Sequence, residues 1–157
     1  MVGTLAAERE VILVDLAGVG GSTGTTPNTV EGMAHNAFAF LDAIQLHRYD
    51  LLGFSIGGFV AQEMALFRPW QVRRLVLAGT APRGGRDIHL YKAGATHNAA
   101  FDDAATAANL LTLFFAKSAS SQAKGVEFLK RLRLRTAERG TPAGLAVRDA
   151  QLTAISA

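Results

Sequence analysis

The stretch YDLLGFSIGGFVAQEMALF, residues 49–67, decides the fold. Its first six residues, Tyr49–Phe54, are apolar enough to predict a short strand. The residues Gly57–Phe67 that follow predict a helix, which Pro69 stops. Between the two, residues 53–57 read GFSIG and fit the pattern G-x-S-x-G. The pattern therefore lies at the junction of a strand and a helix.

A strand-to-helix junction is the place where this pattern carries chemistry. A serine on such a sharp turn is held in a strained backbone conformation that exposes its hydroxyl. Glycine is expected at positions 53 and 57 because a Cβ there would collide with the neighbouring strand or helix, and Gly58 widens the clearance. The helix dipole and the backbone N–H of Ile56 would face an oxyanion formed at Ser55. Ser55 is therefore a candidate nucleophile, and Ile56 is a candidate oxyanion-hole donor.

The same serine has a purely structural alternative. Serine is common in glycine-rich turns between a strand and a helix, where its side chain caps the helix. On this interpretation Ser55 hydrogen-bonds to the first helical turn and carries no chemistry.

The segments around this junction predict two further strands and another helix. VILVDL, Val11–Leu16, is apolar without alternation, as expected for a strand that is covered on both faces. A helix is expected from near Asn28, with Asn28 as its N-cap and Glu31 reaching back, and RRLVLAG, Arg73–Gly79, predicts a third strand. Alternating strands and helices are typical of a parallel sheet, so the fold class is α/β.

The two halves of the chain differ in composition, and they divide near residues 82–86. The second half shows no strand pattern and predicts helices over residues 98–116, 120–139 and 143–155. In the first half, the apolar positions of the helix near Asn28 recur at helical spacing and predict its buried face, formed by Val30, Met33, Ala34, Ala37, Phe38, Leu41 and Ile44.

From Val11 to Gly85 the sequence resembles the central part of an α/β-hydrolase. The resemblance rests on three features: the strand-to-helix turn with the G-x-S-x-G pattern at residues 53–57, here called the elbow, the strands and helices around it, and the glycine-rich turn after Leu16. In that turn Asp15, Gly18, Gly20 and Ser22 correspond to the family's D-x-x-G-x-G-x-S, which shapes the pocket floor. The helical remainder is similar to the cap that such enzymes insert after this strand.

The resemblance implies a partial α/β-hydrolase fold. It would comprise three parallel strands with crossover helices in a core over residues 1–84, followed by a helical cap-like segment over residues 85–157. It implies hydrolysis of a small carboxylic ester or related acyl substrate, with Ser55 as nucleophile and the Ile56 amide as half of the oxyanion hole. It implies no cofactor and no metal.

In the family, the triad acid and histidine follow the serine on later strands, and no residue of this sequence matches either motif. The second oxyanion donor is also unmatched, so we expect the chain to be an internal fragment whose activity alone is uncertain. In the sheet of the family, a further strand lies in space between the strands that correspond to Val11–Leu16 and Tyr49–Phe54. We therefore expect the position of that strand to be vacant in this sheet.

Four histidines are the only stand-in bases that the sequence offers. His35 and His47 are expected at the surface or at a helix end. His89 and His97 follow the third strand, with Asp87, Asp102 and Asp103 close by in the sequence, and leave a makeshift triad as an alternative.

The composition limits the other function classes. The chain has 157 residues and a net charge of +3. It contains no cysteine, so disulfide frameworks, thiol nucleophiles and thiolate zinc sites are excluded. No stretch has the length of a membrane helix, and the start lacks a signal-peptide pattern, so we expect a cytoplasmic protein. The basic segment Lys124–Arg139 is interpreted as a solvated helix face rather than a nucleic-acid site. The turn Gly18–Gly24 lacks the spacing and the lysine of a phosphate-binding loop.

Handedness predicts an exposed face on the sheet. Right-handed crossovers running in one direction place both helices on one face and leave the opposite apolar face bare. We therefore expect marginal folding or self-association through that face. The alternative to an enzyme is a non-catalytic hydrolase remnant that acts, if at all, as an interaction protein.

Overall fold

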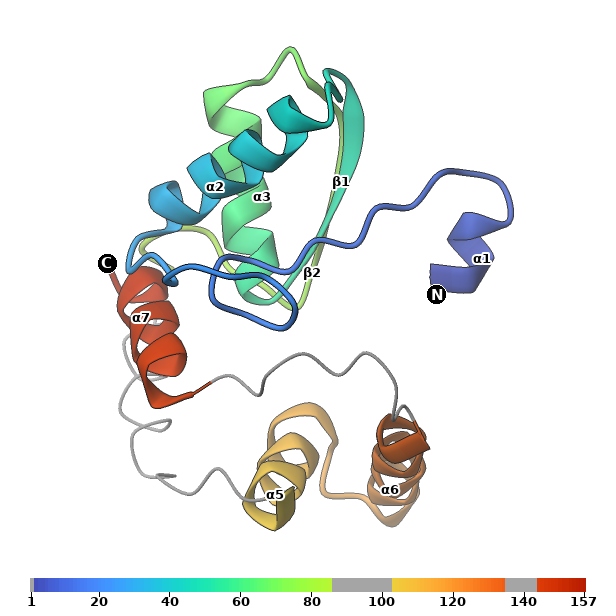
Figure 1. Ribbon diagram of the computed structural model, residues 1–157. Helices are drawn as coiled ribbons and strands as arrows, with labels where there is room; N and C mark the ends of the chain where they lie inside the picture. Colours follow the sequence, from blue (N-terminus) through green and yellow to red (C-terminus); the bar gives the residue numbers. More distant parts are fainter. Residues whose placement is uncertain (1, 86–102, 135–143) are drawn as a thin grey trace.

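The computed structural model describes residues 2–85, 103–134 and 144–157. The first part of the chain alternates helices and strands, and the second is helical throughout the described residues (Figure 1). The elements are α1 (Val2–Ala6), α2 (Val30–Ala43), β1 (Tyr49–Phe54), α3 (Ile56–Phe67), β2 (Val72–Ala78), α5 (Asp103–Phe114), α6 (Ala119–Leu134) and α7 (Leu145–Ile155).

Strands β1 and β2 form a parallel two-stranded sheet, with Leu52 opposite Val76 and Phe54 opposite Ala78. Helix α3 connects the two strands and contacts both, and α2 packs on α3. Both helices therefore lie on the same side of the strands (Figure 1). The α/β fold class and the strand-helix-strand unit around the elbow are confirmed.

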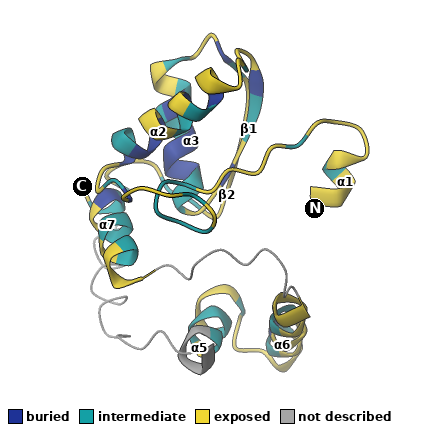
Figure 2. Ribbon diagram, viewed as in Figure 1, coloured by how far each residue is buried: buried dark blue, intermediate teal, exposed yellow. Residues whose placement is uncertain are grey.

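The prediction of a third strand at Val11–Leu16 is wrong. These residues belong to no strand, and residues 12–15 are exposed (Figure 2). Leu13 is 73% exposed. A strand exists only where its backbone N–H and C=O groups pair with a neighbour. Within the described part of the chain, the ladder joins β1 to β2 alone. The apolar run therefore pairs with no other strand among the described residues.

Helix α2 begins one residue later than the sequence suggests. Its N-cap is Thr29 rather than Asn28, and the Thr29 side chain accepts a hydrogen bond of 3.0 Å from the Gly32 amide. Asn28 is exposed, and the carboxylate of Glu31 pairs with Arg83. The Asn28 capping box is therefore wrong, because a neighbouring threonine provides the equivalent cap in extended backbone geometry.

The core lies between α2, α3 and the inner face of β1. Five of the seven predicted α2 positions are buried, whereas Ala37 is half-buried and Ile44 is exposed. Helix α7 contacts α3 and adds Ala154 to the same cluster. The core residues are Val30, Met33, Ala34, Phe38, Leu41, Tyr49, Phe59, Val60, Met64 and Ala154.

The outer face of the sheet is exposed, as handedness predicts. Along β1, Tyr49 and Gly53 are buried, whereas Leu52 and Phe54 are exposed by 46% and 54%. On β2, Val76 is 52% exposed opposite Leu52. This outer sheet face, Leu52, Phe54 and Val76, is apolar.

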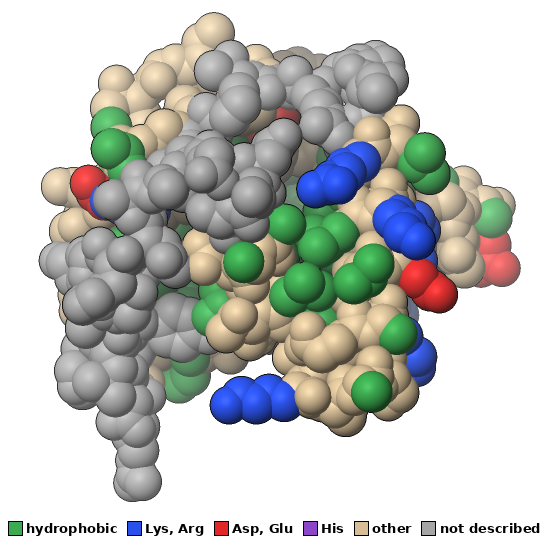
Figure 3. Space-filling view, turned by 90° about the horizontal axis from the view of Figure 1, so that it is seen from below, with side chains coloured by type: hydrophobic (Ala, Val, Ile, Leu, Met, Phe, Trp, Pro, Cys, Tyr) green, Lys and Arg blue, Asp and Glu red, His purple; other side chains and the backbone are tan. Residues whose placement is uncertain are grey.

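Helices α5 and α6 pack against each other at a glycine. A Cβ at Gly125 would lie 2.4 Å from Leu111, and the Phe115 and Phe128 rings are 5.9 Å apart. The predicted helices over residues 98–116, 120–139 and 143–155 are confirmed where the structure describes them, while residues 98–102 and 135–143 lie outside it. Figure 3, seen from the side of α5 and α6, shows apolar side chains with Lys and Arg beside them.

Two glycines set how closely α3 approaches the strands. A Cβ at Gly53 would lie 2.5 Å from the carbonyl oxygen of Gly57, and one at Gly58 would lie 2.5 Å from Cβ of Thr80. Among the described residues, nothing lies within 4 Å of the Cβ position at Gly57. The steric requirement for glycine therefore holds at 53 and 58, and the expectation of a collision at 57 is wrong.

This contrast predicts different effects for two neighbouring substitutions. Gly58→Ala is expected to lower the free energy of unfolding by about 1–3 kcal/mol, because the new methyl group overlaps Thr80. Gly57→Ala is the matched control and is expected to leave the free energy unchanged or raise it by up to about 1 kcal/mol, because alanine favours a helix. Urea unfolding followed by circular dichroism measures both. Equal destabilisation by the two variants would contradict the packing described here.

Candidate active site

Ser55 joins β1 to α3 in a left-handed backbone conformation. Its φ is 51° and its ψ is −123°, values that L-residues other than glycine rarely adopt. Its amide donates to the carbonyl oxygen of Ala78 at 3.0 Å, and its carbonyl oxygen accepts from the amide of Gly58 at 2.8 Å. Strain of this kind persists only when the surroundings fix it, and here β2 and the first turn of α3 do so.

The Ser55 side chain is exposed and makes no capping hydrogen bond to α3, although Ser55 occupies the N-cap position. The interpretation that this serine serves only as a side-chain cap is therefore wrong.

The backbone amide of Ile56 is the first in α3, and the first amides of a helix have no acceptor within it. The first turn of α3 contains no acidic residue to compete for its positive dipole end. The carboxyl ends of β1 and β2 meet at the same edge, where ligands bind in open parallel sheets. An anionic oxygen beside Ser55 is therefore favoured electrostatically.

The turn after Leu16 is held by its own polar groups. Asp15 accepts a hydrogen bond from the Gly21 amide at 2.9 Å through its side chain, and its carbonyl oxygen accepts one from the Ser22 hydroxyl at 2.8 Å. A Cβ at Gly20, whose φ is +58°, would overlap the Asp15 carboxylate at 2.3 Å. The spacing of Asp15, Gly20 and Ser22 thus builds a closed turn.

This turn borders a hollow of about 370 Å³ between residues 13–17 and α2, which also involves Asn36 and Phe40. None of residues 53–57 lines this hollow. Ser55 therefore does not open into this hollow, and the pocket-floor role of the turn stays a prediction.

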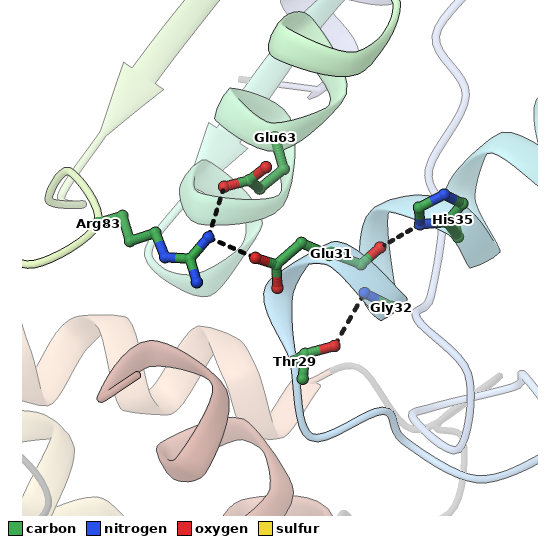
Figure 4. Close-up of polar contacts among 6 residues, drawn as sticks. All are labelled: Thr29, Glu31, Gly32, His35, Glu63 and Arg83. Atoms are coloured by element: carbon green, nitrogen blue, oxygen red, sulfur yellow. Dashed lines mark hydrogen bonds and ion pairs between the residues drawn. The ribbon is translucent and has the colours of Figure 1, made fainter.

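The two histidines that the structure describes, His35 and His47, are both exposed. His35 is exposed on α2, with Nδ1 2.8 Å from the Glu31 carbonyl oxygen (Figure 4). Its ring centroid lies 5.1 Å from that of Phe67. His47 is exposed after α2. His89 and His97, with Asp87 and Asp102, lie outside the described residues, so the makeshift triad stays a prediction.

Sequence reasoning missed an ion-pair cluster behind the elbow. Arg83, which follows β2, pairs with Glu31 at the start of α2 and lies 4.0 Å from Glu63 on α3 (Figure 4). The Glu31 carboxyl accepts a hydrogen bond from the backbone amide of Glu31 itself, and the positive charge of Arg83 adds to this effect. Together they hold the pKa of the Glu31 carboxyl below its usual value. The cluster fixes the chain after β2 to both helices. No local pattern indicates a pairing across 52 residues.

The described residues hold neither a metal-binding cluster nor a membrane-spanning helix. Residues 2–85, 103–134 and 144–157 hold no group of three or more metal-ligating side chains. In these same ranges, none of the helices combines the length and the apolar character needed to cross a membrane.

Known proteins share this arrangement. A solved structure described as an alpha/beta hydrolase fold protein from Chitinophaga pinensis superposes with a TM-score of 0.82 at 37% identity, over 90% of this chain and 50% of that one. A 2-hydroxymuconate semialdehyde hydrolase from Pseudomonas sp. (strain CF600) is 38% identical over 49% of this chain and 28% of its own length. A pimeloyl-[acyl-carrier protein] methyl ester esterase from Edwardsiella ictaluri is 35% identical over 52% of this chain and 30% of its own length.

These matches thus span about half of that solved structure and under a third of the two curated relatives. The sequence profile of the alpha/beta hydrolase fold matches residues 1–133, most of the chain. The resemblance inferred from the elbow is confirmed at the level of the family: this chain belongs to the alpha/beta hydrolase fold family.

Proposed function

We propose that the chain carries the nucleophile of a serine hydrolase, which acts on a small carboxylic ester or a related acyl substrate. The observation that carries the proposal is the left-handed, uncapped and exposed Ser55 at the start of α3. Relatives named as a hydrolase and as a methyl ester esterase support the same class of chemistry.

The chemistry follows from the positions of Ser55 and Ile56. The Ser55 hydroxyl oxygen attacks the acyl carbonyl, and its proton passes to a base. The negative charge that develops on the carbonyl oxygen is stabilised by the Ile56 amide and the dipole of α3. The alcohol leaves with a proton, and water then hydrolyses the acyl-enzyme to the carboxylic acid. In the family the base is a histidine whose motif no residue of this sequence matches, so turnover depends on a group beyond Ser55 and Ile56.

Covalent labelling tests the nucleophile directly. A fluorophosphonate probe is expected to add one phosphonyl group to Ser55, because its phosphorus centre resembles a tetrahedral acyl intermediate. Intact-protein mass spectrometry and peptide mapping measure the adduct. Ser55→Ala is expected to abolish labelling, whereas Ser120→Ala, which removes an exposed serine from α6, is expected to leave it unchanged. No adduct on folded protein would count against the nucleophile.

The outer sheet face favours a second candidate function, that of a non-catalytic protein that associates with itself. Leu52, Phe54 and Val76 expose adjacent apolar surface on a sheet that has two strands in the described part of the chain. Isolated two-stranded sheets are marginal in water, and exposed apolar strands attract other chains. We therefore propose that copies of this chain associate through the outer sheet face.

Size-exclusion chromatography with light scattering tests this association. The wild-type chain is expected to elute above the 16.6 kDa of a monomer and to bind a hydrophobic dye. Val76→Glu is expected to shift the population toward the monomer, because it places a charge opposite Leu52. Leu134→Glu adds the same charge at an exposed position on α6 and is the control. A monodisperse wild-type monomer that melts cooperatively would overturn this proposal.

A further inference from the structure

Residues 117–134, which include α6, carry cations that other side chains leave unneutralised. Glu127 is the one acidic residue in this segment, and its basic residues, all of them exposed, are Lys117, Lys124, Lys130, Arg131 and Arg133. None of these five forms an ion pair with another described residue. In the strand-helix core, by contrast, Arg68, Arg73 and Arg83 each pair with a carboxylate. The positive charge of α6 is therefore available to an anionic partner.

One face of α6 combines two of these cations with two apolar side chains. The spacing i, i+4, i+7, i+8 places four residues on the same side of a helix, and here they are Val126, Lys130, Arg133 and Leu134. Val126 is 44% exposed and Leu134 is 79% exposed. We call these four residues the α6 basic face.

The opposite side of α6 is already covered by α5. Gly125 is buried, and a Cβ there would lie 2.4 Å from Leu111 of α5. Phe128 is half-buried, with its ring centroid 5.9 Å from that of Phe115. The side of the molecule formed by α5 and α6 shows Lys and Arg beside apolar side chains (Figure 3). The packing on α5 therefore leaves the α6 basic face turned outward.

A membrane surface with anionic lipids fits this face better than other polyanions do. Lipid phosphates attract the cations, and the boundary of the acyl chains takes up the apolar side chains between them. A nucleic acid would match the cations, but its bases stack on exposed aromatic rings, and Phe128, the aromatic residue of α6, is half-buried. A purely solvated face, as the sequence suggests, gives Val126 and Leu134 no favourable contact.

We propose that the α6 basic face docks this protein on a membrane surface that contains anionic lipids. The helix lies in the plane of the interface, where Lys130 and Arg133 contact lipid phosphates. Val126 and Leu134 enter the boundary of the acyl chains and leave water. The proposal goes beyond the chemistry proposed for Ser55 and does not depend on it.

Flotation with phospholipid vesicles tests the docking on the full chain, because self-associated protein without lipid does not float. The chain is expected to float with vesicles of phosphatidylcholine and phosphatidylglycerol in equal parts, and to stay behind with vesicles of phosphatidylcholine alone. Lys130→Gln combined with Arg133→Gln is expected to weaken binding about thirtyfold, because two cations are lost at the lipid surface. Leu134→Ser is expected to weaken it about tenfold with the charge unchanged.

Arg9→Gln combined with Arg48→Gln is the matched control, because both arginines are exposed outside α6 and their loss removes the same charge. This control is expected to change binding by less than about twofold, and circular dichroism checks that every variant keeps its helix content. Equal losses in the two double variants would reduce the effect to net charge and overturn the proposal. Equal flotation with neutral and anionic vesicles, or no flotation with either, would also overturn it. Binding to a single-stranded oligonucleotide as tight as to the vesicles, and unaffected by Leu134→Ser, would assign the face to nucleic acid instead.

Discussion

The structure depends on one backbone constraint, the left-handed turn at Ser55. A non-glycine residue at φ 51° is unfavourable on its own, and contacts on both sides offset that cost. The Ser55 amide is tied to β2 through Ala78, and Gly53 and Gly58 allow α3 to lie against the strand ends without a steric clash. The turn at Ser55 directs the start of α3 toward the edge of the sheet where β1 and β2 end. The Ile56 amide therefore lies at that edge.

The segments predicted correctly are those whose determinants are local. The apolar run of β1, the helical spacing of α2 and the G-x-S-x-G pattern each lie within a few residues, and each appears where the sequence places it. The resemblance to α/β-hydrolases rested on the same local features, and the family match confirms it. The sequence left open whether Ser55 is a nucleophile or a helix cap. The structure rules out the side-chain cap, because the Ser55 side chain makes no capping hydrogen bond to α3.

The segments predicted wrongly depend on neighbours that a local pattern does not contain. Val11–Leu16 has the composition of a buried strand but pairs with no neighbouring strand among the described residues. Thr29 and Asn28 are both good caps, and backbone geometry alone decided between them. The pattern predicted that a Cβ at Gly57 would collide with the neighbouring strand or helix, but no described residue lies within 4 Å of that position. The ion pair of Arg83 with Glu31, and the meeting of Phe54 with Phe114, join residues far apart in the chain.

The position of α7 bears on the order in which this chain folds. Ala154 is buried in the cluster built by α2 and α3, although most of the chain separates it from them. Closing so long a loop costs conformational entropy before the contact stabilises anything. During synthesis, α2 and α3 leave the ribosome before α7 does, so the part of the cluster that Ala154 covers closes only after α7 has emerged. The nascent chain therefore exposes part of this cluster until α7 emerges.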